Sequence, residues 1–185
     1  MIPRQYMSVR FFPWWSMLNS DQVVGLIGMM NSIFKSKIQI NSFVEIGSHL
    51  GESSTIFLSF DQIKTMYCID PWNQDKIFEE IFDERLKPFI DSGRCKKIKT
   101  VSLLGSNNFL DSSIDMVYID GNHEYEYVIQ DINIWYPKIK QKGILSGHDY
   151  SDYHPGSKRA IDEFIQSHNL TLNTFIDSSW YVIKE

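Results

Sequence analysis

The segment Phe43–Ser54 constrains the fold most, because a short apolar run leads there into a turn with two glycines. The apolar residues predict a buried strand, and Gly47 and Gly51 suit a sharp turn because glycine carries no Cβ atom. Ser53 and Ser54 follow where a helix is expected, and they could cap this helix or begin it. A strand that enters a helix through a glycine turn is typical of α/β folds that bind a nucleotide-like ligand there.

The spacing of these glycines differs from that of dinucleotide-binding proteins. From Glu45 to Gly51 the segment reads Glu-x-Gly-x-x-x-Gly, without the first Gly-x-Gly of the pattern that holds a pyrophosphate. The carboxylate of Glu45 would also repel a pyrophosphate, whereas it suits a ligand that carries an ammonium group. Asp70 ends the next apolar run 25 positions later, close to the offset at which βαβ folds place an acid on ribose hydroxyls.

Apolar periodicity predicts that strands and helices alternate along the chain. The expected helices are Ser20–Phe34, a short one from Ser53, Asp75–Leu86 with Pro88 as its stop, Glu124–Trp135, and one around Ala160–Ile165. Strands are expected at Glu45, Thr65–Asp70, Ile98–Ser102, Asp115–Asp120, Gly143–His148, Thr171–Ile176 and Trp180–Ile183, with a polar loop at Gly105–Asn108. This order predicts one doubly wound, Rossmann-like α/β domain, whose seven-stranded sheet is mostly parallel and ends in an antiparallel C-terminal pair.

Composition and charge limit the partners of this chain. Its 185 residues suit one domain, and its net charge of −5 argues against nucleic acid, which is bound through clustered Lys and Arg. Cys68 in an expected strand and Cys95 in an expected loop make no disulfide framework, which favours a reducing compartment. No apolar run reaches the roughly 18 residues of a membrane span, and prolines interrupt any signal-peptide pattern. We therefore expect a cytoplasmic protein that binds neither nucleic acid nor a membrane.

Residues 1–19 are expected to be distinct from the domain formed by residues 20–185. Aromatic side chains crowd around Pro13 without helical periodicity: Tyr6, Phe11, Phe12, Trp14 and Trp15. Such side chains favour half-buried contacts. The segment therefore predicts either a subunit interface, which would make the protein a homo-oligomer, or a lid over a substrate, and both interpretations stay open.

Ligands of open α/β sheets bind outside the carboxyl ends of the strands, so the residues expected there are candidates for a site. They are Glu45, Asp70, Ser106, Asp120 and Asp149. The carboxylates would repel one another unless a cation, a hydrogen-bond network or a positively charged ligand compensates them. His123 and His148 are expected at the same edge. Together these groups suit either a divalent cation or a carboxylate-oriented histidine that acts as a general base.

Five segments together resemble a class I S-adenosylmethionine-dependent methyltransferase, and most closely the small-molecule O-methyltransferases of the macrocin type. They are Val44–Gly51, Cys68–Trp72, Asp115–Tyr125, Gly147–Tyr150 and Ala160–Phe164, and the resemblance covers roughly residues 40–184. It implies S-adenosylmethionine as the cofactor and the hydroxyl group of a small molecule as the acceptor, with a sugar hydroxyl favoured.

The resemblance also implies which residues hold the cofactor. Glu45, Gly47, Ser48, Gly51 and Ser53 match the motif around its methionine part, where Glu45 would face the ammonium group. Asp70 matches the acid on the ribose hydroxyls, Pro71 and Trp72 would line the base, and Ser106 falls near the adenine-contacting position. Asp120 is expected to contact the cofactor as well.

Catalytic and metal-binding roles follow from the same resemblance. His123 matches a proposed general base, three residues after Asp120, and Asp120 and Asp149 match the acids that hold Mg²⁺ in metal-dependent members. Those members usually supply a third oxygen ligand beside Asp149, where this chain has His148 and Tyr150. Substrate specificity would come from the N-terminal segment, the Tyr150–Ser157 loop or another subunit.

Three other interpretations remain. Tyr136-x-x-x-Lys140 is a pattern of nicotinamide-dependent oxidoreductases, but the incomplete glycine pattern counts against such an enzyme. His123, His148 and Asp149 have the ligand types of a non-haem iron oxygenase, which would leave Glu45 and Asp70 unexplained. A non-catalytic partner subunit could keep the whole fold.

Overall fold

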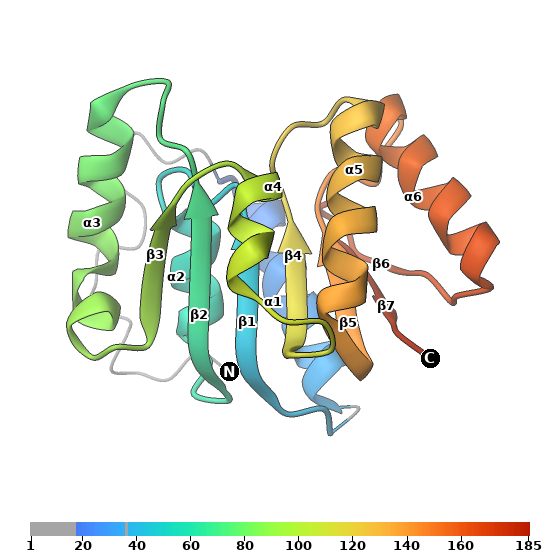
Figure 1. Cartoon of the computed structure of the whole chain (residues 1–185), viewed down its shortest axis with the longest axis horizontal. Coiled ribbons are helices and arrows are strands. Elements are labelled where there is room, and N and C mark those ends of the chain that lie inside the picture. Colours follow the sequence, from blue (N-terminus) through green and yellow to red (C-terminus); the bar gives the residue numbers. More distant parts are fainter. Residues whose placement is uncertain (1–17, 36) are drawn as a thin grey trace.

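The computed structural model describes residues 18–35 and 37–185, which form a sheet of seven strands between helices (Figure 1). The strand order is β3-β2-β1-β4-β5-β7-β6. The first five strands in this order pair in parallel, whereas β7 is antiparallel to both β5 and β6. The predicted fold class is therefore confirmed. Residues 1–17, which make up almost all of the expected N-terminal segment, lie outside the described residues.

Strands and helices alternate as far as the last helix. The strands are β1 (Ile40–Ile46), β2 (Ile63–Asp70), β3 (Cys95–Lys99), β4 (Ile114–Ile119), β5 (Ile139–Gly147), β6 (Asn173–Thr174) and β7 (Trp180–Ile183). The α-helices are α1 (Ser20–Lys35), α2 (Glu52–Leu58), α3 (Lys76–Asp91), α4 (Ser102–Gly105), α5 (Tyr125–Trp135) and α6 (Pro155–His168), with short 3₁₀ turns at Ser106–Asn108 and Tyr136–Lys138. Among these described residues, no helix combines the length and the apolar character needed to cross a membrane.

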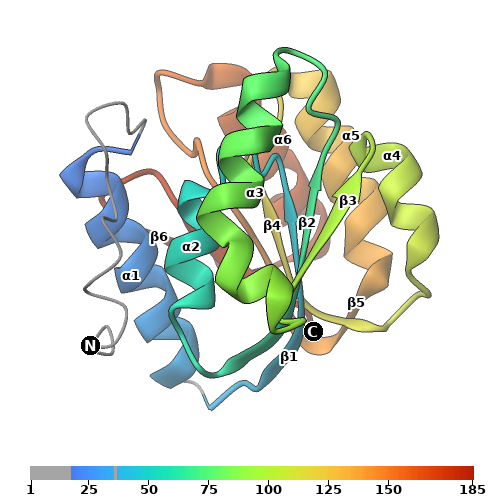
Figure 2. The same cartoon turned by 90° about the vertical axis from the view of Figure 1, so that its left-hand side faces the viewer.

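The helices cover both faces of the sheet, as Figure 2 shows. Side chains alternate between the faces along a strand, so Phe43 packs with α1 to α3 while its neighbour Val44 packs with α5 and α6. The first cluster includes Met29, Met30, Phe57 and Phe82, and the second is centred on Trp135, Ile132, Ile161 and Phe164. Two apolar layers therefore hold the strands in a fixed position.

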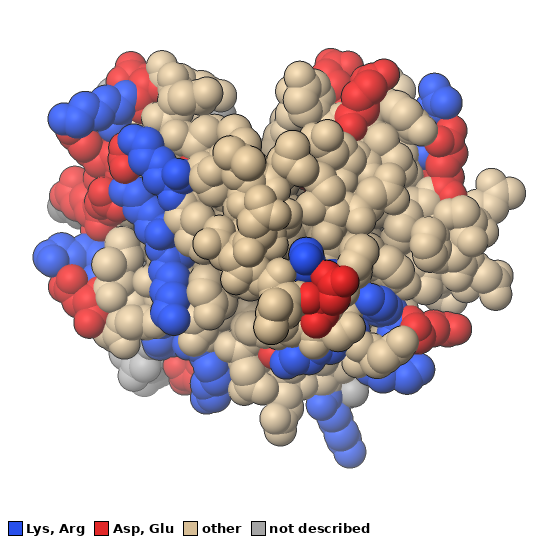
Figure 3. Space-filling view, viewed as in Figure 1, with Lys and Arg blue, Asp and Glu red and all other residues tan. Residues whose placement is uncertain are grey.

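The parallel strands point their carboxyl ends to one edge, which is the upper edge in Figure 1. The strand order reverses between β1 and β4, because the chain runs outward from β1 through β2 and β3 and then returns to β4. Figure 3 shows that the surface is hollowed at this edge, between the sides covered by α3 and by α5 and α6. Such a crevice is where open α/β sheets bind ligands.

Several predicted boundaries were wrong. The helix α3 continues through Pro88 to Asp91. Because this proline lies in the last turn, it removes only one N–H donor from the helix, and its carbonyl still accepts a hydrogen bond from Ser92 N. The third strand is Cys95–Lys99 rather than Ile98–Ser102, since Cys95, expected in a loop, pairs with Met66 and is buried. Its long polar side chains had masked the strand pattern.

Two further elements differ in extent. The expected polar loop Gly105–Asn108 is helical, as the end of α4 and a 3₁₀ turn. The expected strand Thr171–Ile176 has only the two-residue ladder Asn173–Thr174, and it leads into a turn that reaches the strand ends of the sheet. This turn contains Asp177, which lies near His148.

Candidate active site

Glu45 lies one residue before the end of β1, at the carboxyl edge of the sheet, yet it is 0% exposed. Ser53 Oγ donates a hydrogen bond of 2.6 Å to Glu45 Oε1, and the Ser54 hydroxyl donates to Oε2. Burial raises the pKa of Glu45 to about 7, although the hydrogen bonds from the serines oppose this shift. Of the two roles expected for these serines, they begin α2 rather than cap it: both lie in its first turn, Gly51 is the N-cap residue, and no side chain caps it. The serines instead tie α2 to β1.

Gly47 brings the turns after β1 and β4 into contact. Its φ is +85°, and a Cβ atom at this position would lie 2.0 Å from the carbonyl oxygen of Asp120. Only glycine fits here, because any other side chain would push the two strand ends apart. The adjacent Ser48 is buried, and its hydroxyl oxygen makes no hydrogen bond of ordinary geometry within the described residues. A buried polar atom of this kind suits a polar group of a ligand.

Asp70 at the end of β2 organises the same turn. Its carboxylate accepts hydrogen bonds from His49 N at 3.0 Å and from Trp72 N at 2.7 Å. The Trp72 indole donates to the His49 carbonyl, packs on Phe82 and is 5% exposed, so it lies mainly in the core rather than on the crevice. Asp70 therefore links the ends of β1 and β2.

Ser106 lies after the third strand, as expected, but its side chain turns inward. The residue is buried, and its hydroxyl donates a hydrogen bond of 2.8 Å to the Leu103 carbonyl. This bond closes the turn between α4 and the 3₁₀ helix. A cofactor contact through Ser106, like the other predicted cofactor contacts, stays a prediction.

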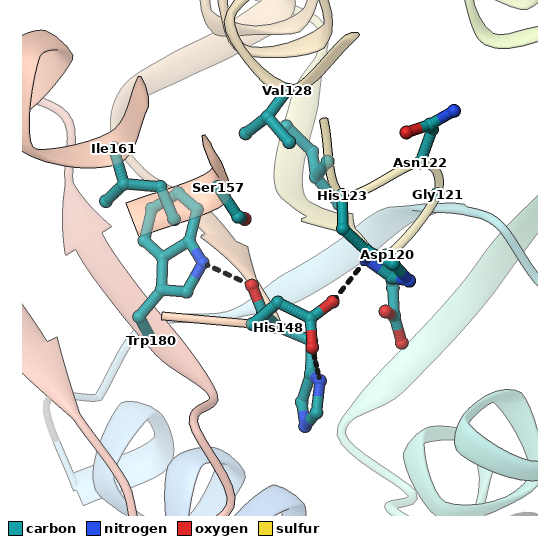
Figure 4. Close-up of a pocket in the computed structure, with 11 residues that line it drawn as sticks. Asp120, Gly121, Asn122, His123, Val128, His148, Ser157, Ile161 and Trp180 are labelled. Carbon is teal, nitrogen blue, oxygen red and sulfur yellow. Dashed lines mark hydrogen bonds and ion pairs between the residues drawn. The ribbon is translucent and has the colours of Figure 1, made fainter. Parts of the chain in front are cut away.

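Asp149, just beyond β5, is the centre of a group of three histidines, His123, His148 and His154. Figure 4 labels the first two of them. Oδ2 of Asp149 lies 2.5 Å from Nδ1 of His123, and its Oδ1 lies 2.9 Å from Nδ1 of His148 and 3.4 Å from Nε2 of His154. Burial opposes ionisation of Asp149, but hydrogen bonds from His123 and His148 outweigh it and hold its pKa well below the usual range. The hydrogen-bond network that the crowded acids require is thus formed by imidazoles.

The histidines respond to the same contacts. The hydrogen bond to Asp149 raises the pKa of His123. Burial opposes a charge on His148, but its hydrogen bond to Asp149 and the charges of Asp120 and Asp149 raise its pKa to about 9. Burial raises the pKa of Asp120 to about 6. Asp120, His123, His148 and Asp149 together line a pocket between the ends of β4 and β5.

A second carboxylate, Asp177, approaches His148 from the other side. Asp177 Oδ2 lies 3.9 Å from His148 Nε2, and Ser179 donates to the Asp177 carboxylate through its backbone N and its hydroxyl. Gly25 of α1 leaves room for this side chain, since a Cβ atom there would lie 2.0 Å from Asp177 Cγ. The Trp180 indole donates to the His148 carbonyl at 3.2 Å and fixes the backbone (Figure 4).

The structure thus brings together Glu45, Asp70, Asp120 and Asp149 along one edge, with His123 beside them. Sequence reasoning missed His154, which lies in a loop, and Asp177, which lies in a turn with no recognisable motif. The Tyr136 and Lys140 pair is not part of the site, because Tyr136 packs on Phe164 and Lys140 Nζ bonds to Asp115 at 2.6 Å.

The arrangement around His123 can transfer a proton. Its Nδ1 faces Asp149, whereas no described residue hydrogen-bonds to its Nε2, and the side chain is 47% exposed. A carboxylate that fixes one imidazole nitrogen leaves the other nitrogen oriented for a reacting group.

Comparison with known proteins yields a family. A family model described as "Methyltransferase domain" matches residues 44–150. The uncharacterized protein R132 of Acanthamoeba polyphaga mimivirus is 30% identical over 116 residues, which are 60% of this chain and 52% of R132. The uncharacterized protein y4gI of Sinorhizobium fredii is 26% identical over 118 residues, which are 57% of this chain and 13% of y4gI. The chain therefore spans about half, or less, of the length of these curated relatives.

Solved structures share the fold. A Staphylococcus aureus protein described as a candidate caffeoyl-CoA O-methyltransferase superimposes with a TM-score of 0.66 at 18% identity, covering 86% of this chain and 82% of that one. CalS11, described as a TDP-rhamnose 3'-O-methyltransferase of calicheamicin biosynthesis, gives 0.63 at 14% identity, covering 90% and 81%. Spermidine synthase from Thermotoga maritima gives 0.55 at 16% identity, covering 79% and 54%. At these identities the likeness is one of fold.

Proposed function

The chain belongs to the methyltransferase domain family, and from this membership we propose that it transfers a methyl group from S-adenosylmethionine to the hydroxyl group of a small molecule. The observation that supports this proposal best is the contact of His123 with Asp149 at the carboxyl ends of β4 and β5. A hydroxyl group is a poor nucleophile until its proton is removed, so a methyltransferase that acts on oxygen needs a positioned base.

His123 is proposed as that base. Asp149 holds the proton on Nδ1, which leaves the lone pair of Nε2 free to accept the proton of the acceptor hydroxyl. During methyl transfer, the proton of the acceptor hydroxyl would move to Nε2 of His123, and the carboxylate of Asp149 would stabilise the resulting imidazolium. Asp120, at the end of the neighbouring strand, faces the same pocket.

The turn after β1 fits the methyl donor. When bound, S-adenosylmethionine supplies a methyl group that is already activated by a positively charged sulfur. Gly47 keeps a Cβ atom away from the junction of the two turns, and the Ser48 hydroxyl has no ordinary hydrogen-bond partner among the described residues. Burial raises the pKa of Glu45, and the charge of Asp120 adds to this shift, so a positively charged ligand would relieve the repulsion between the two carboxylates.

The remaining cofactor contacts are proposals of the same kind. Gly51 and Ser53 would complete the methionine side, and Asp70 would accept from the ribose hydroxyls. Pro71, Trp72 and Ser106 are proposed to border the base, for which the buried Trp72 and Ser106 side chains would have to become more accessible than they are in this structure. In the present structure the Asp70 carboxylate binds two backbone amides, so ribose binding would add to these bonds or replace one of them.

Mg²⁺ does not fit the donor atoms around Asp149. This ion prefers oxygen ligands in an octahedron, whereas three imidazole rings surround the carboxylate here. The group of described residues at the two strand ends that could hold an ion has two carboxylates, Asp120 and Asp149, and an imidazole, His148, in place of a third oxygen ligand. No step of the proposed reaction is therefore assigned to Mg²⁺.

The acceptor is proposed to be a sugar hydroxyl, as in macrocin-type enzymes. One structural neighbour, CalS11, is described as an enzyme that methylates TDP-rhamnose, which is in keeping with this proposal. The predicted specificity loop Tyr150–Ser157 ends within α6, which begins at Pro155, and its last residue, Ser157, lines the pocket. The aromatic segment of residues 1–19 is proposed to act as a lid or as the interface of a homo-oligomer. A cytoplasmic location without nucleic-acid or membrane partners also stays a prediction.

Calorimetry with S-adenosylmethionine and with NAD tests the choice of ligand. We expect binding of the first and none of the second. Incubation of the protein with extracts and methyl-labelled S-adenosylmethionine would then identify the acceptor, with His123→Ala as the inactive control. A chain that binds S-adenosylmethionine but labels nothing in any extract would instead fit the non-catalytic partner subunit.

A further inference from the structure

Two groups of described residues gather enough nitrogen and oxygen donors to hold a metal ion. One is Asp120, His148 and Asp149, and the other is His123, Asp149 and His154. In each group the ligand atoms lie within 4.8 Å of one another. The two groups share Asp149, so they are alternatives, and the contacts of their histidines decide between them.

We infer that Asp120, His148 and Asp149 bind a divalent first-row transition metal ion, such as Mn²⁺, Co²⁺ or Zn²⁺, in preference to Mg²⁺, and that Asp177 is a positioning residue for His148. The inference deepens the proposed function, on which it rests for the role of the site. It follows from the donor atoms, because carboxylates alone would suit Mg²⁺, whereas an imidazole ligand shifts the preference to transition metals.

The geometry of the donors supports this site. His148 Nδ1 and Asp149 Oδ1 are 2.9 Å apart. Two atoms bound at about 2.1 Å to one ion, at right angles, would lie about 3 Å apart. Asp120 completes the group from the adjacent strand end. Two carboxylates and a neutral imidazole carry two negative charges, which one dication neutralises.

The surroundings of His148 resemble those of a metal ligand. A histidine that binds a metal through one nitrogen usually directs the other N–H to a carboxylate, which fixes the ring and its tautomer. His148 Nε2 faces Asp177 Oδ2 at 3.9 Å, and Asp177 is itself held by two hydrogen bonds from Ser179. The carboxylate is buried in the turn before β7, with Gly25 beside it. Asp177 thus lies on the Nε2 side of the His148 ring, while Nδ1 is hydrogen-bonded to Asp149, and we assign Asp177 the role of orienting the ring when Nδ1 binds the ion.

The second group lacks such support. His123 and His154 are more exposed, their rings contact each other at a centroid distance of 4.8 Å, and no second carboxylate is bonded to either within the described residues. His123 bonds to Asp149 Oδ2, which leaves Oδ1 for the ion. His123 can therefore remain the proposed base while Asp149 binds the ion through its other oxygen.

The test is metal binding by the full-length protein after chelator treatment and dialysis, measured by calorimetry and, for Co²⁺, by visible absorption. We expect one ion per chain and an affinity for Co²⁺ and Zn²⁺ at least about 100-fold above that for Mg²⁺. His148→Ala should weaken Zn²⁺ binding by about 100-fold or more, whereas the control His168→Gln, on α6 beside Phe164, should leave it unchanged. His148→Asp should restore Mg²⁺ binding by supplying a third oxygen ligand.

The positioning role of Asp177 has its own readout. Asp177→Asn should weaken Co²⁺ binding by about 10- to 100-fold and shift the absorption spectrum at saturating Co²⁺, which a loss of stability alone would not do. Circular dichroism of each variant confirms that it is folded.

Three results would overturn the inference. The wild-type protein could bind Mg²⁺ as tightly as Zn²⁺, or bind no metal, in which case His148 is an imidazolium between two carboxylates. Alternatively, His154→Ala could abolish metal binding while His148→Ala does not, which would place the ion in the second group. Binding of S-adenosylmethionine to the metal-free protein is measured separately, so a failed metal site and a failed methyltransferase assignment are distinguishable.

Discussion

Nδ1 of His123 lies 2.5 Å from Oδ2 of Asp149, although the two residues belong to loops that follow different strands. The contact exists because β4 and β5 are neighbours in the sheet and end at the same level, with Ile119 beside Gly147. The carboxylate is nearly buried and the imidazole is half exposed. One partner is therefore fixed by the fold, while the other faces the pocket in which an acceptor is proposed to bind.

His123→Ala should lower the turnover number for methyl transfer by about 100- to 10,000-fold, because it removes the proposed base. Its affinity for S-adenosylmethionine should change little, since the ring faces the acceptor side. Transfer of labelled methyl to the identified acceptor, together with calorimetry, measures both quantities. His168→Gln serves as the control with normal activity. Full turnover by His123→Ala would falsify the assigned role.

Glu45→Gln should make stability less dependent on pH. Burial raises the pKa of Glu45 from 4.5 to about 7, so its contribution to stability is fully present below pH 4.5 and is lost as the pH rises through 7. The variant should therefore gain up to about 3 kcal/mol relative to wild type between pH 4.5 and pH 8. Urea denaturation without cofactor measures the difference.

Glu84→Gln, at an exposed position of α3, is the control for this measurement and should show no such gain. If Glu45→Gln and wild type keep a constant difference across this pH range, then Glu45 is ionised throughout in the folded protein.

Gly25→Ala should destabilise the protein by about 1–3 kcal/mol, because the added methyl group would collide with the Asp177 carboxylate. Gly28→Ala in the same helix should instead stabilise it by about 0.5–1 kcal/mol, since the new Cβ atom meets Phe175 at an ordinary distance of 3.6 Å and alanine favours a helix. Thermal and urea denaturation distinguish the two. Equal effects of both substitutions would mean that Asp177 does not occupy the space beside Gly25.

Asp70→Asn should affect both stability and cofactor binding. An asparagine amide nitrogen cannot accept a hydrogen bond, so one of the bonds from His49 N and Trp72 N would be lost, which costs about 1 kcal/mol. Affinity for S-adenosylmethionine should fall as well, if Asp70 binds the ribose. Asp75→Asn is the matched control, because asparagine caps a helix as well as aspartate does. Unchanged cofactor affinity in Asp70→Asn would argue against the ribose role alone.

Much of the fold could be predicted from sequence because its strongest strands are apolar and short. The runs that end at Asp70 and Asp120 predicted two strands, which lie on either side of β1 in the sheet, and the glycines at positions 47 and 51 located the turn. Prediction was wrong where local chemistry conflicts with tertiary packing. Cys95 begins a strand whose other residues are mostly lysines. Pro88 lies inside α3, and the helix tolerates it because it falls in the last turn.

The site could be predicted in part for the same reason. Residues directly after parallel strands lie at the same edge of the sheet, so the sequence alone could place Asp120, His123 and Asp149 together. His154 and Asp177 could not, because a loop and a β-turn reach the site only through the path of the chain in three dimensions. Periodicity carries no information on such paths. The burial of Glu45 beneath two serines was equally hidden, since a strand-end acid usually faces solvent.

The hairpin of β6 and β7 both completes the sheet and places Asp177 and Trp180 against His148. During synthesis on the ribosome these residues emerge long after β1 to β5, when the glycine turn and its neighbouring strands could already have formed. A nascent chain that lacks the hairpin would leave His148 without these two partners. Formation of the complete candidate site is thus coupled to the arrival of β7, so an incomplete chain would lack the proposed activity.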